Sequence, residues 1–132
     1  GSILIGPAPF IRQARRVRKV FGGGMRQAGF MAAAGIYSLE HHIDRLAEDH
    51  HHAREIASAL GKKEFIRSIM PVETNIVIVE VDPILPAKTL AQQLKEKGVL
   101  VIAISANQLR FVTHLDITPE MVRKAIGIIA EW

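Results

Sequence analysis

The sequence predicts an α/β protein in which a helical first part leads into a small layer of strands and helices. Two patterns indicate this fold class. Apolar residues recur every three or four positions over most of the first part, which is typical of amphipathic helices. Later, short runs rich in β-branched residues alternate with helical patterns. A length of 132 residues, with 48% hydrophobic and 23% charged residues, suits a globular chain with a real core.

The chain opens with a short apolar run. Ser2–Ile5 is too brief for a helix and predicts a buried strand, and Gly6–Pro9 then predicts a turn. A helix should follow, because four apolar residues form one stripe at helical spacing. They are Phe10, Ala14, Val17 and Phe21. Three consecutive glycines, Gly22–Gly24, suit neither helix nor strand and should end this helix.

The longest helical pattern runs from Met25 to Leu60. Its first part, Phe30–Ile36, is apolar on every side, so we expect it to be buried all round. One straight helix of this length would measure about 54 Å, which is too long for a small globule to cover. The helix should therefore either break, with the polar run Glu48–His52 as the expected position, or bridge two domains. Gly61 is a suitable C-cap.

The remaining sequence, from residue 62, predicts the order β-β-α-β-β-α, with the sheet on one side and the helices on the other. The expected strands are Phe65–Met70, Asn75–Val81, Val99–Ile104 and Leu109–His114. The first helix contains Leu90 and Leu94 and should end at Gly98. The second begins after Thr118, an N-cap residue followed by proline at the first helical position, and continues to Trp132.

The net charge of +4 is unevenly distributed along the chain. The first 39 residues contain six basic residues and no acidic one. The basic residues are Arg12, Arg15, Arg16, Arg18, Lys19 and Arg26. Such a cluster can neutralise the phosphates of a nucleic acid. Because interleaved aromatic residues and a DNA-binding motif are missing, we favour a solvated or subunit-facing surface and expect no nucleic-acid partner.

Two further classes of site and partner are disfavoured. Cysteine is absent, which excludes disulfides and thiolate zinc sites. Five histidines cluster near acidic residues, but they lack the i, i+4 histidine pair of zinc sites, so we expect exposed polarity and no metal. These histidines are His41, His42, His50, His51 and His52. No apolar run approaches the roughly 20 residues of a membrane span, so we expect no membrane partner. The absence of cysteine fits the cytoplasmic location that we expect.

Two arginines are candidates for anion binding. Arg26 follows the three glycines at the start of a helix, where a guanidinium group would bind an anion through charge-assisted hydrogen bonds. Arg110 stands in an otherwise apolar strand, where arginine is seldom buried without an anion. An edge-strand position or a structural ion pair explains Arg110 equally well. With no nucleophile motif, Walker loop or dinucleotide fingerprint, these patterns alone indicate an anion-binding α/β chain.

Blocks of residues spread over nearly the whole chain resemble a known family. They are Gly1–Gly6, Phe10–Ile11 with Ala14–Lys19, Gly22–Gly29, Ala32–Gly35, Arg45–His50 and Leu109–His114. Together they resemble the threonine aldolase family. The block GGGMRQAG, followed far downstream by RFVTH, is the most specific part of this resemblance.

The resemblance implies a carbon–carbon lyase that uses pyridoxal phosphate and has fold type I, the aspartate aminotransferase type. Enzymes of this family cleave L-threonine or L-allo-threonine to glycine and acetaldehyde by retro-aldol chemistry. The resemblance implies that Arg26 binds the cofactor phosphate of the neighbouring subunit and that Arg110 holds the substrate carboxylate. We therefore expect a homodimer or tetramer that acts on a small amino acid.

In the family that the chain resembles, the lysine carrying the cofactor lies a few residues before the segment that this chain matches. No lysine of this chain stands in that context. Residues 1–48 would then be the end of the large cofactor-binding domain with the connecting helix, and residues 49–132 the small C-terminal α/β domain. Such a C-terminal portion would hold no catalytic residue, bind no cofactor covalently and be inactive alone. The alternative is a non-catalytic oligomerisation or regulatory module derived from this fold.

Overall fold

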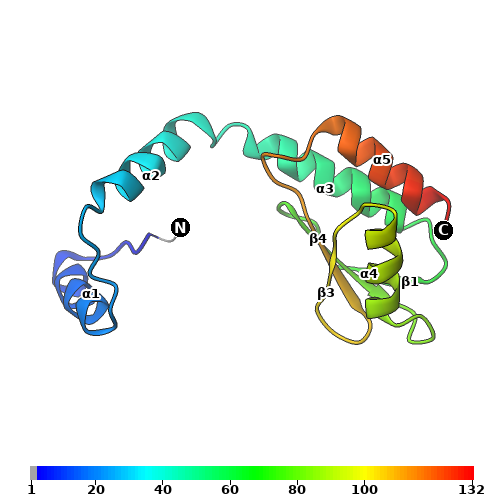
Figure 1. The fold of residues 1–132 in the computed structure, drawn as a ribbon, viewed down its shortest axis with the longest axis horizontal. Coiled ribbons are helices and arrows are strands. Elements are labelled where there is room, and N and C mark those ends of the chain that lie inside the picture. Colours follow the sequence, from blue (N-terminus) through cyan, green and yellow to red (C-terminus); the bar gives the residue numbers. More distant parts are fainter. Residues whose placement is uncertain (1–2) are drawn as a thin grey trace. The chain divides into compact units, whose positions relative to one another are not determined.

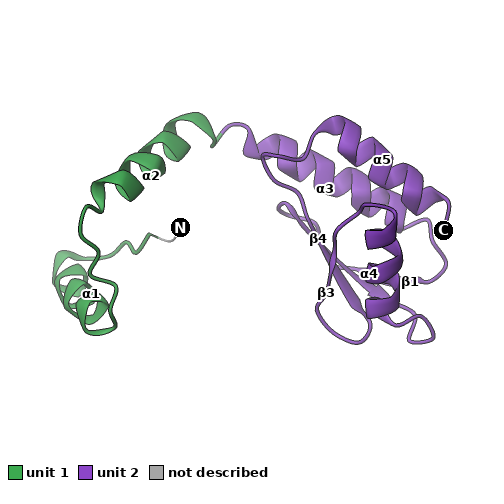
Figure 2. Cartoon of the chain, viewed as in Figure 1, with its two compact units in different colours: residues 1–43 green, residues 44–132 purple. Residues whose placement is uncertain are grey.

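The computed structural model describes residues 3–132, which form parts of two compact units, residues 1–43 and 44–132 (Figure 1, Figure 2). The first unit contains the helices α1 (Ala8–Val20) and α2 (Gly29–His41). The second unit contains a four-stranded sheet and the helices α3 (Leu46–Leu60), α4 (Ala87–Glu96) and α5 (Pro119–Ala130). The prediction of an α/β chain with a helical first part is therefore confirmed.

The three glycines end α1, as predicted, because the chain turns back tightly on the helix. Gly22 has a φ of 81°, which is the left-handed conformation that glycine adopts without strain. The N–H of Gly23 donates a hydrogen bond of 2.7 Å to the carbonyl oxygen of Arg18. A Cβ atom on Gly23 would lie only 3.1 Å from that oxygen, so a side chain at this position would displace the turn.

Two expectations for the first unit are wrong within the described residues. The strand expected at Ser2–Ile5 does not form: Ser2 lies outside the described residues, and Ile3–Ile5 are exposed and have no strand partner. Phe30–Ile36 is not buried on all sides, since the side chain of Phe30 is 80% exposed and α2 has no buried residue. Burial and strand pairing both need a second surface, and the described part of this unit supplies only α1 and α2.

The long helical pattern breaks, but earlier than the expected Glu48–His52. Residues 42–45 leave the helical path, and Glu48–His52 lies inside α3. The N–H of Glu48 bonds to the carbonyl oxygen of Arg45 at 2.9 Å, so α3 begins with a tight turn.

Residues 3–132 contain no helix with the length and hydropathy of a membrane span.

The sheet of the second unit follows the predicted order β-β-α-β-β-α. Its strands are β1 (Ile66–Ile69), β2 (Ile76–Val81), β3 (Ile102–Ala103) and β4 (Gln108–Val112). They pair antiparallel in the order β1-β2-β4-β3. β3 is much shorter than the expected Val99–Ile104, and β4 ends before the expected His114. β2 and β4 are therefore the long strands of the sheet, and β3 is a short edge strand.

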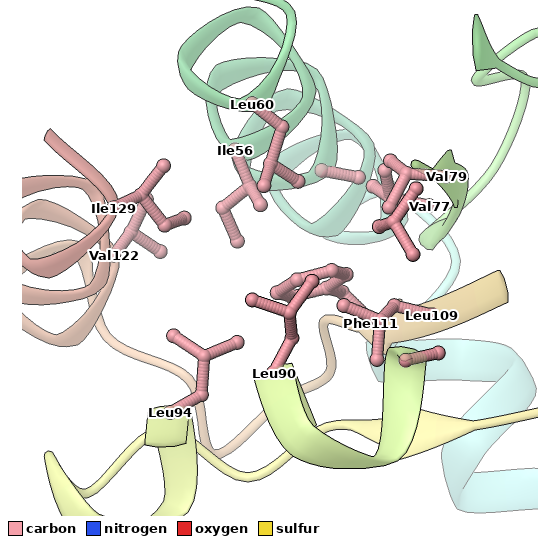
Figure 3. Close-up of a cluster of buried hydrophobic side chains, with 13 residues drawn as sticks. Ile56, Leu60, Val77, Val79, Leu90, Leu94, Leu109, Phe111, Val122 and Ile129 are labelled. Atoms are coloured by element: carbon pink, nitrogen blue, oxygen red, sulfur yellow. The ribbon is translucent and has the colours of Figure 1, made fainter. Parts of the chain in front are cut away.

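One face of this sheet, the inner face, packs against the helices. Val77 and Val79 on β2 lie opposite Phe111 and Leu109 on β4, so these four apolar side chains share that face. Leucine, isoleucine and valine side chains from α3, α4 and α5 complete one core with them (Figure 3). The helix residues labelled in Figure 3 are Ile56, Leu60, Leu90, Leu94, Val122 and Ile129. The other face, here called the outer face, carries Ile78 and Arg110.

The predicted helix ends of the second unit are confirmed, except that α5 ends at Ala130 and not at the expected Trp132. The N–H of Met121 donates to Oγ1 of Thr118 at 3.3 Å, so Thr118 caps α5 before the proline at its first turn. Gly98 follows α4 with a φ of 86°, and Gly61 is the C-cap of α3. These caps fix the lengths of the three helices that cover the inner face.

The carboxylate of Asp82, after β2, should make stability depend on pH. The N–H of Ile84, 2.9 Å from Oδ1, and the nearby Arg67 guanidinium hold the pKa of Asp82 below its ordinary value of 3.8. The folded state thus favours the ionised form, and this stabilisation is complete above the ordinary pKa and is lost as the pH falls through the lowered one. Asp82→Asn should lower the urea midpoint near pH 7.

The control for this prediction is Glu73→Gln, which removes an exposed acid of the same unit. Urea unfolding would be measured for both variants near pH 7 and near pH 2.5, which lie on either side of carboxylate titration. The deficit of Asp82→Asn should shrink at the lower pH. A deficit that stays constant between the two pH values would contradict this role of the Asp82 carboxylate.

Candidate functional site

Arg110 lies in β4 on the outer face, between isoleucines on both neighbouring strands. Ile78 on β2 and Ile102 on β3 are its partners across the sheet. The side chain is half-buried, and its Nε atom is shielded from solvent without a hydrogen-bond acceptor. No carboxylate within residues 3–132 forms an ion pair with this guanidinium. A half-buried cation with a free donor is suited to binding an anion from outside the described chain.

The acid that shares the outer face of β2 is already occupied by other partners. Glu80 lies two residues from Ile78 and so points to the same side of the sheet. Its Oε2 accepts a hydrogen bond from Ser68 at 3.1 Å, and its Oε1 accepts one from Asn107 at 2.9 Å. Both carboxylate oxygens therefore already accept a hydrogen bond, one from β1 and one from the turn between β3 and β4. The positive charge of Arg110 remains available.

The end of β4 is fastened by Thr113, which is only 2% exposed. Its hydroxyl donates a hydrogen bond of 2.7 Å to the carbonyl oxygen of Asp49 in α3. Its N–H donates to the carbonyl oxygen of Asn75 at 3.0 Å, and its own carbonyl oxygen accepts from Nδ2 of Asn75 at 2.6 Å. Thr113 thus joins the end of β4 both to the residue preceding β2 and to the first turns of α3.

An ion pair supports the α3 side of this connection. Arg45 binds the 3% exposed Asp49 through two parallel hydrogen bonds, of 2.9 Å and 3.1 Å. The hydrogen bond to Asp49 raises the pKa of Arg45 above its already high ordinary value. The two-pronged geometry satisfies both oxygens of a nearly buried carboxylate, which would otherwise be costly to desolvate. The first turn of α3 is thereby held in one conformation.

Arg26 belongs to the other unit and lies in the segment between α1 and α2. Its side chain is exposed, and the following residue, Gln27, has a φ of 51°, a conformation that is uncommon for residues other than glycine. α2 begins next to it, and its N-cap residue, Ala28, provides no side-chain hydrogen bond. An exposed arginine beside an uncapped helix N-terminus has the chemistry of a phosphate site.

The histidine cluster differs in part from the expected exposed polarity. His41 is exposed and stacks on Tyr37 with ring centroids 4.1 Å apart, and His51 lies 3.7 Å from a carboxylate oxygen of Glu55. His52, in contrast, is only 7% exposed, and its Nδ1 atom has no hydrogen-bond partner. It faces the core because α3 turns one side toward the sheet. No group of three potential ligands capable of holding a metal ion occurs among residues 3–132.

Sequence reasoning missed the residues that connect the end of β4 to α3 and to the residue before β2. The pair of Arg45 and Asp49 has the i, i+4 spacing of a helical ion pair, so a signal for it was present. Nothing comparable pointed to Thr113 or Asn75, because their contacts join residues 38 and 64 positions apart. Such contacts become visible only once the strand register is known.

Comparison with known proteins identifies the family. A family model described as beta-eliminating lyase matches residues 1–83. The chain belongs to the beta-eliminating lyase family. The low specificity L-threonine aldolase of Escherichia coli (strain K12) is 39% identical over 132 residues, which are 100% of this chain and 37% of that protein. Low-specificity L-threonine aldolase 1 of Arabidopsis thaliana is 36% identical over 130 residues, 96% of this chain and 36% of that protein.

These matches confirm the resemblance to threonine aldolases, and this chain spans about a third of the length of those relatives. The fold class is also confirmed by solved structures. One of ornithine aminotransferase from Toxoplasma gondii matches with a TM-score of 0.51 and 27% identity, covering 67% of this chain and 22% of that one. That enzyme holds pyridoxal phosphate at its active site with partial occupancy. The chain therefore has the fold of part of a type I pyridoxal-phosphate enzyme.

The residues of this chain fit one end of pyridoxal phosphate. The exposed Arg26 beside the start of α2 suits the phosphate group. A lysine that carries the cofactor is normally desolvated, which lowers its pKa. None of the lysines among residues 3–132 is buried, and Lys63, the most enclosed of them, donates its Nζ hydrogen bond to the carbonyl oxygen of Ala130 at 2.7 Å. Arg26 thus suits the phosphate group, and no described lysine stands in a desolvated position.

Proposed function

We propose that the whole protein containing this chain is a threonine aldolase that cleaves L-threonine or L-allo-threonine to glycine and acetaldehyde. One observation carries the proposal: Arg110 is a half-buried cation with a free Nε donor and no paired anion among residues 3–132. It stands in the block RFVTH, which lies in the region of similarity to the L-threonine aldolases. A cytoplasmic location for this enzyme is part of the proposal.

The role we assign to Arg110 is binding of the substrate carboxylate. A guanidinium group presents a planar fork of donors that matches a carboxylate in two parallel hydrogen bonds. Ile78 and Ile102 on either side restrict its movement and lower the local polarity, which strengthens that ion pair. Holding the carboxylate fixes the orientation of the amino acid around its α-carbon. The bond to the β-carbon can then be aligned for cleavage.

The role we assign to Arg26 is binding of the cofactor phosphate from a neighbouring subunit. When bound, pyridoxal phosphate supplies an acceptor for the electron pair released as the Cα–Cβ bond breaks. The arginine and the start of α2 hold the phosphate end through charge-assisted hydrogen bonds. The exposed apolar side chains of α1 and α2 support assembly into a homodimer or tetramer, because such surfaces are normally covered.

The whole protein should release acetaldehyde and glycine from L-threonine in the presence of pyridoxal phosphate, whereas the 132-residue chain alone should not. The reason is that none of the described lysines is buried in a position to carry the cofactor. Acetaldehyde release by both proteins is the measurement. Enzymatic rates from the short chain would contradict its inactivity. A whole protein that assembles but binds no cofactor would favour the non-catalytic oligomerisation or regulatory module.

Replacing Arg110 should weaken substrate binding. Arg110→Lys keeps the positive charge but loses the planar pair of guanidinium donors, and Arg110→Ala loses both. Because a hydrogen bond to a charged group contributes about 1.5–3 kcal/mol, the KM for L-threonine should rise roughly 10- to 100-fold in Arg110→Ala. The matched control is Arg123→Ala, an exposed arginine paired with Glu120 on α5. An unchanged KM in Arg110→Ala would count against the carboxylate role.

Replacing Arg26 should weaken cofactor retention. Arg26→Ala in the whole protein should bind pyridoxal phosphate roughly tenfold less tightly, since it loses a charge-assisted contact to the phosphate. Cofactor absorbance after dialysis is the measurement. Arg12→Ala on the exposed side of α1 is the control and should retain the cofactor normally. Equal retention by both variants would remove Arg26 from the cofactor site.

A further inference from the structure

The geometry points to Thr113 as a positioning residue that holds Arg110 in its carboxylate-binding orientation. This inference rests on the proposed role of Arg110. Thr113 follows Arg110 by three residues and comes directly after the end of β4, so the two side chains point to opposite sides of the extended backbone. Arg110 points to the outer face, and Thr113 points inward to α3. A rotation of the strand end about its axis would therefore move both side chains together.

The sheet alone constrains this end of β4 unequally. On one side β2 pairs with β4 at five successive positions, from Ile76 opposite Val112 to Glu80 opposite Gln108. On the other side β3 pairs at only two positions, and one of them is Arg110 itself, opposite Ile102. Beyond Val112 the strand has ended, so Thr113 is the first residue that sheet pairing within β4 no longer fixes.

The contacts of Thr113 replace that missing constraint from three directions. Its hydroxyl is bonded to the carbonyl oxygen of Asp49, and both its N–H and its carbonyl oxygen are bonded to Asn75. The α3 end of the connection is supported by Arg45, which binds the Asp49 carboxylate through two hydrogen bonds. Because the buried Thr113 hydroxyl is bonded to α3, it sets the orientation of the end of β4 about the strand axis.

This constraint matters because binding by Arg110 depends on direction. The fork of a guanidinium group meets a carboxylate in two bonds only when both planes are nearly aligned. A displacement of about 1 Å at such a contact can cost up to a hundredfold in rate. A loosened strand end should therefore weaken carboxylate binding even though every atom of Arg110 is still present.

The test is Thr113→Val in the whole protein, a change that keeps the shape of the side chain and removes its hydroxyl. The KM for L-threonine should rise roughly tenfold with little change in kcat. The dissociation constant of glycine, measured by calorimetry, should rise by the same factor, because glycine presents the same carboxylate. Retention of pyridoxal phosphate should not change. Thr113→Ser, which restores the hydroxyl, should recover most of the KM.

A matched control separates positioning from loss of stability. Thr118→Val removes another threonine hydroxyl, the one that caps α5, and so weakens the same unit elsewhere. It should lower the urea midpoint without raising the KM. If Thr113→Val does not fold, Asn75→Ala loosens the same strand end through the other partner and should raise the KM in the same direction.

A double-mutant cycle with Arg110→Ala decides whether Thr113 acts through Arg110. If it does, Thr113→Val should add almost nothing to the KM once Arg110 is absent, whereas an independent effect would multiply. An unchanged KM in Thr113→Val beside a raised KM in Arg110→Ala would overturn the positioning role and leave the function of Arg110 intact. An unchanged KM in Arg110→Ala would overturn the carboxylate role and the positioning role with it.

Discussion

The antiparallel pairing of β2 with β4 is the interaction on which the second unit depends. Its register places Val79 opposite Leu109 on the inner face, and it consequently places Ile78 opposite Arg110 on the outer face. A shift of one residue would bury the arginine in the core and expose the leucine. The same pairing that forms the hydrophobic core therefore also determines that a guanidinium group stands on the outer face of the sheet.

Most of the fold of the second unit could be predicted from the sequence because its signals are local. Alternation and β-branched residues mark β2, and Thr118 with its following proline marks the start of α5. The break at residues 42–45 could not be located, since helical spacing continues through it. The burial expected for Phe30–Ile36 was wrong because an apolar helix shows that a covering surface is needed without showing where that surface is.

The candidate site could be predicted only as separate residues. Arg110 is conspicuous in the sequence as a charge in an apolar strand, and Arg26 as a charge after three glycines. The structure explains why Arg110 is free: Glu80, on the same face, is hydrogen bonded by Ser68 and Asn107. Those partners come from different strands and turns, so strand register, which no local pattern specifies, decides them.

The exposed helices of the first unit have a consequence for how the two units respond to concentration. The second unit completes a core from its own side chains, so its free energy of unfolding is an intrinsic property of the chain. Neither α1 nor α2 has a buried residue, so the order of these helices must draw on surfaces outside the described part of their unit. By mass action, the stability of α1 and α2 then depends on the concentration of the molecule whose surface covers them.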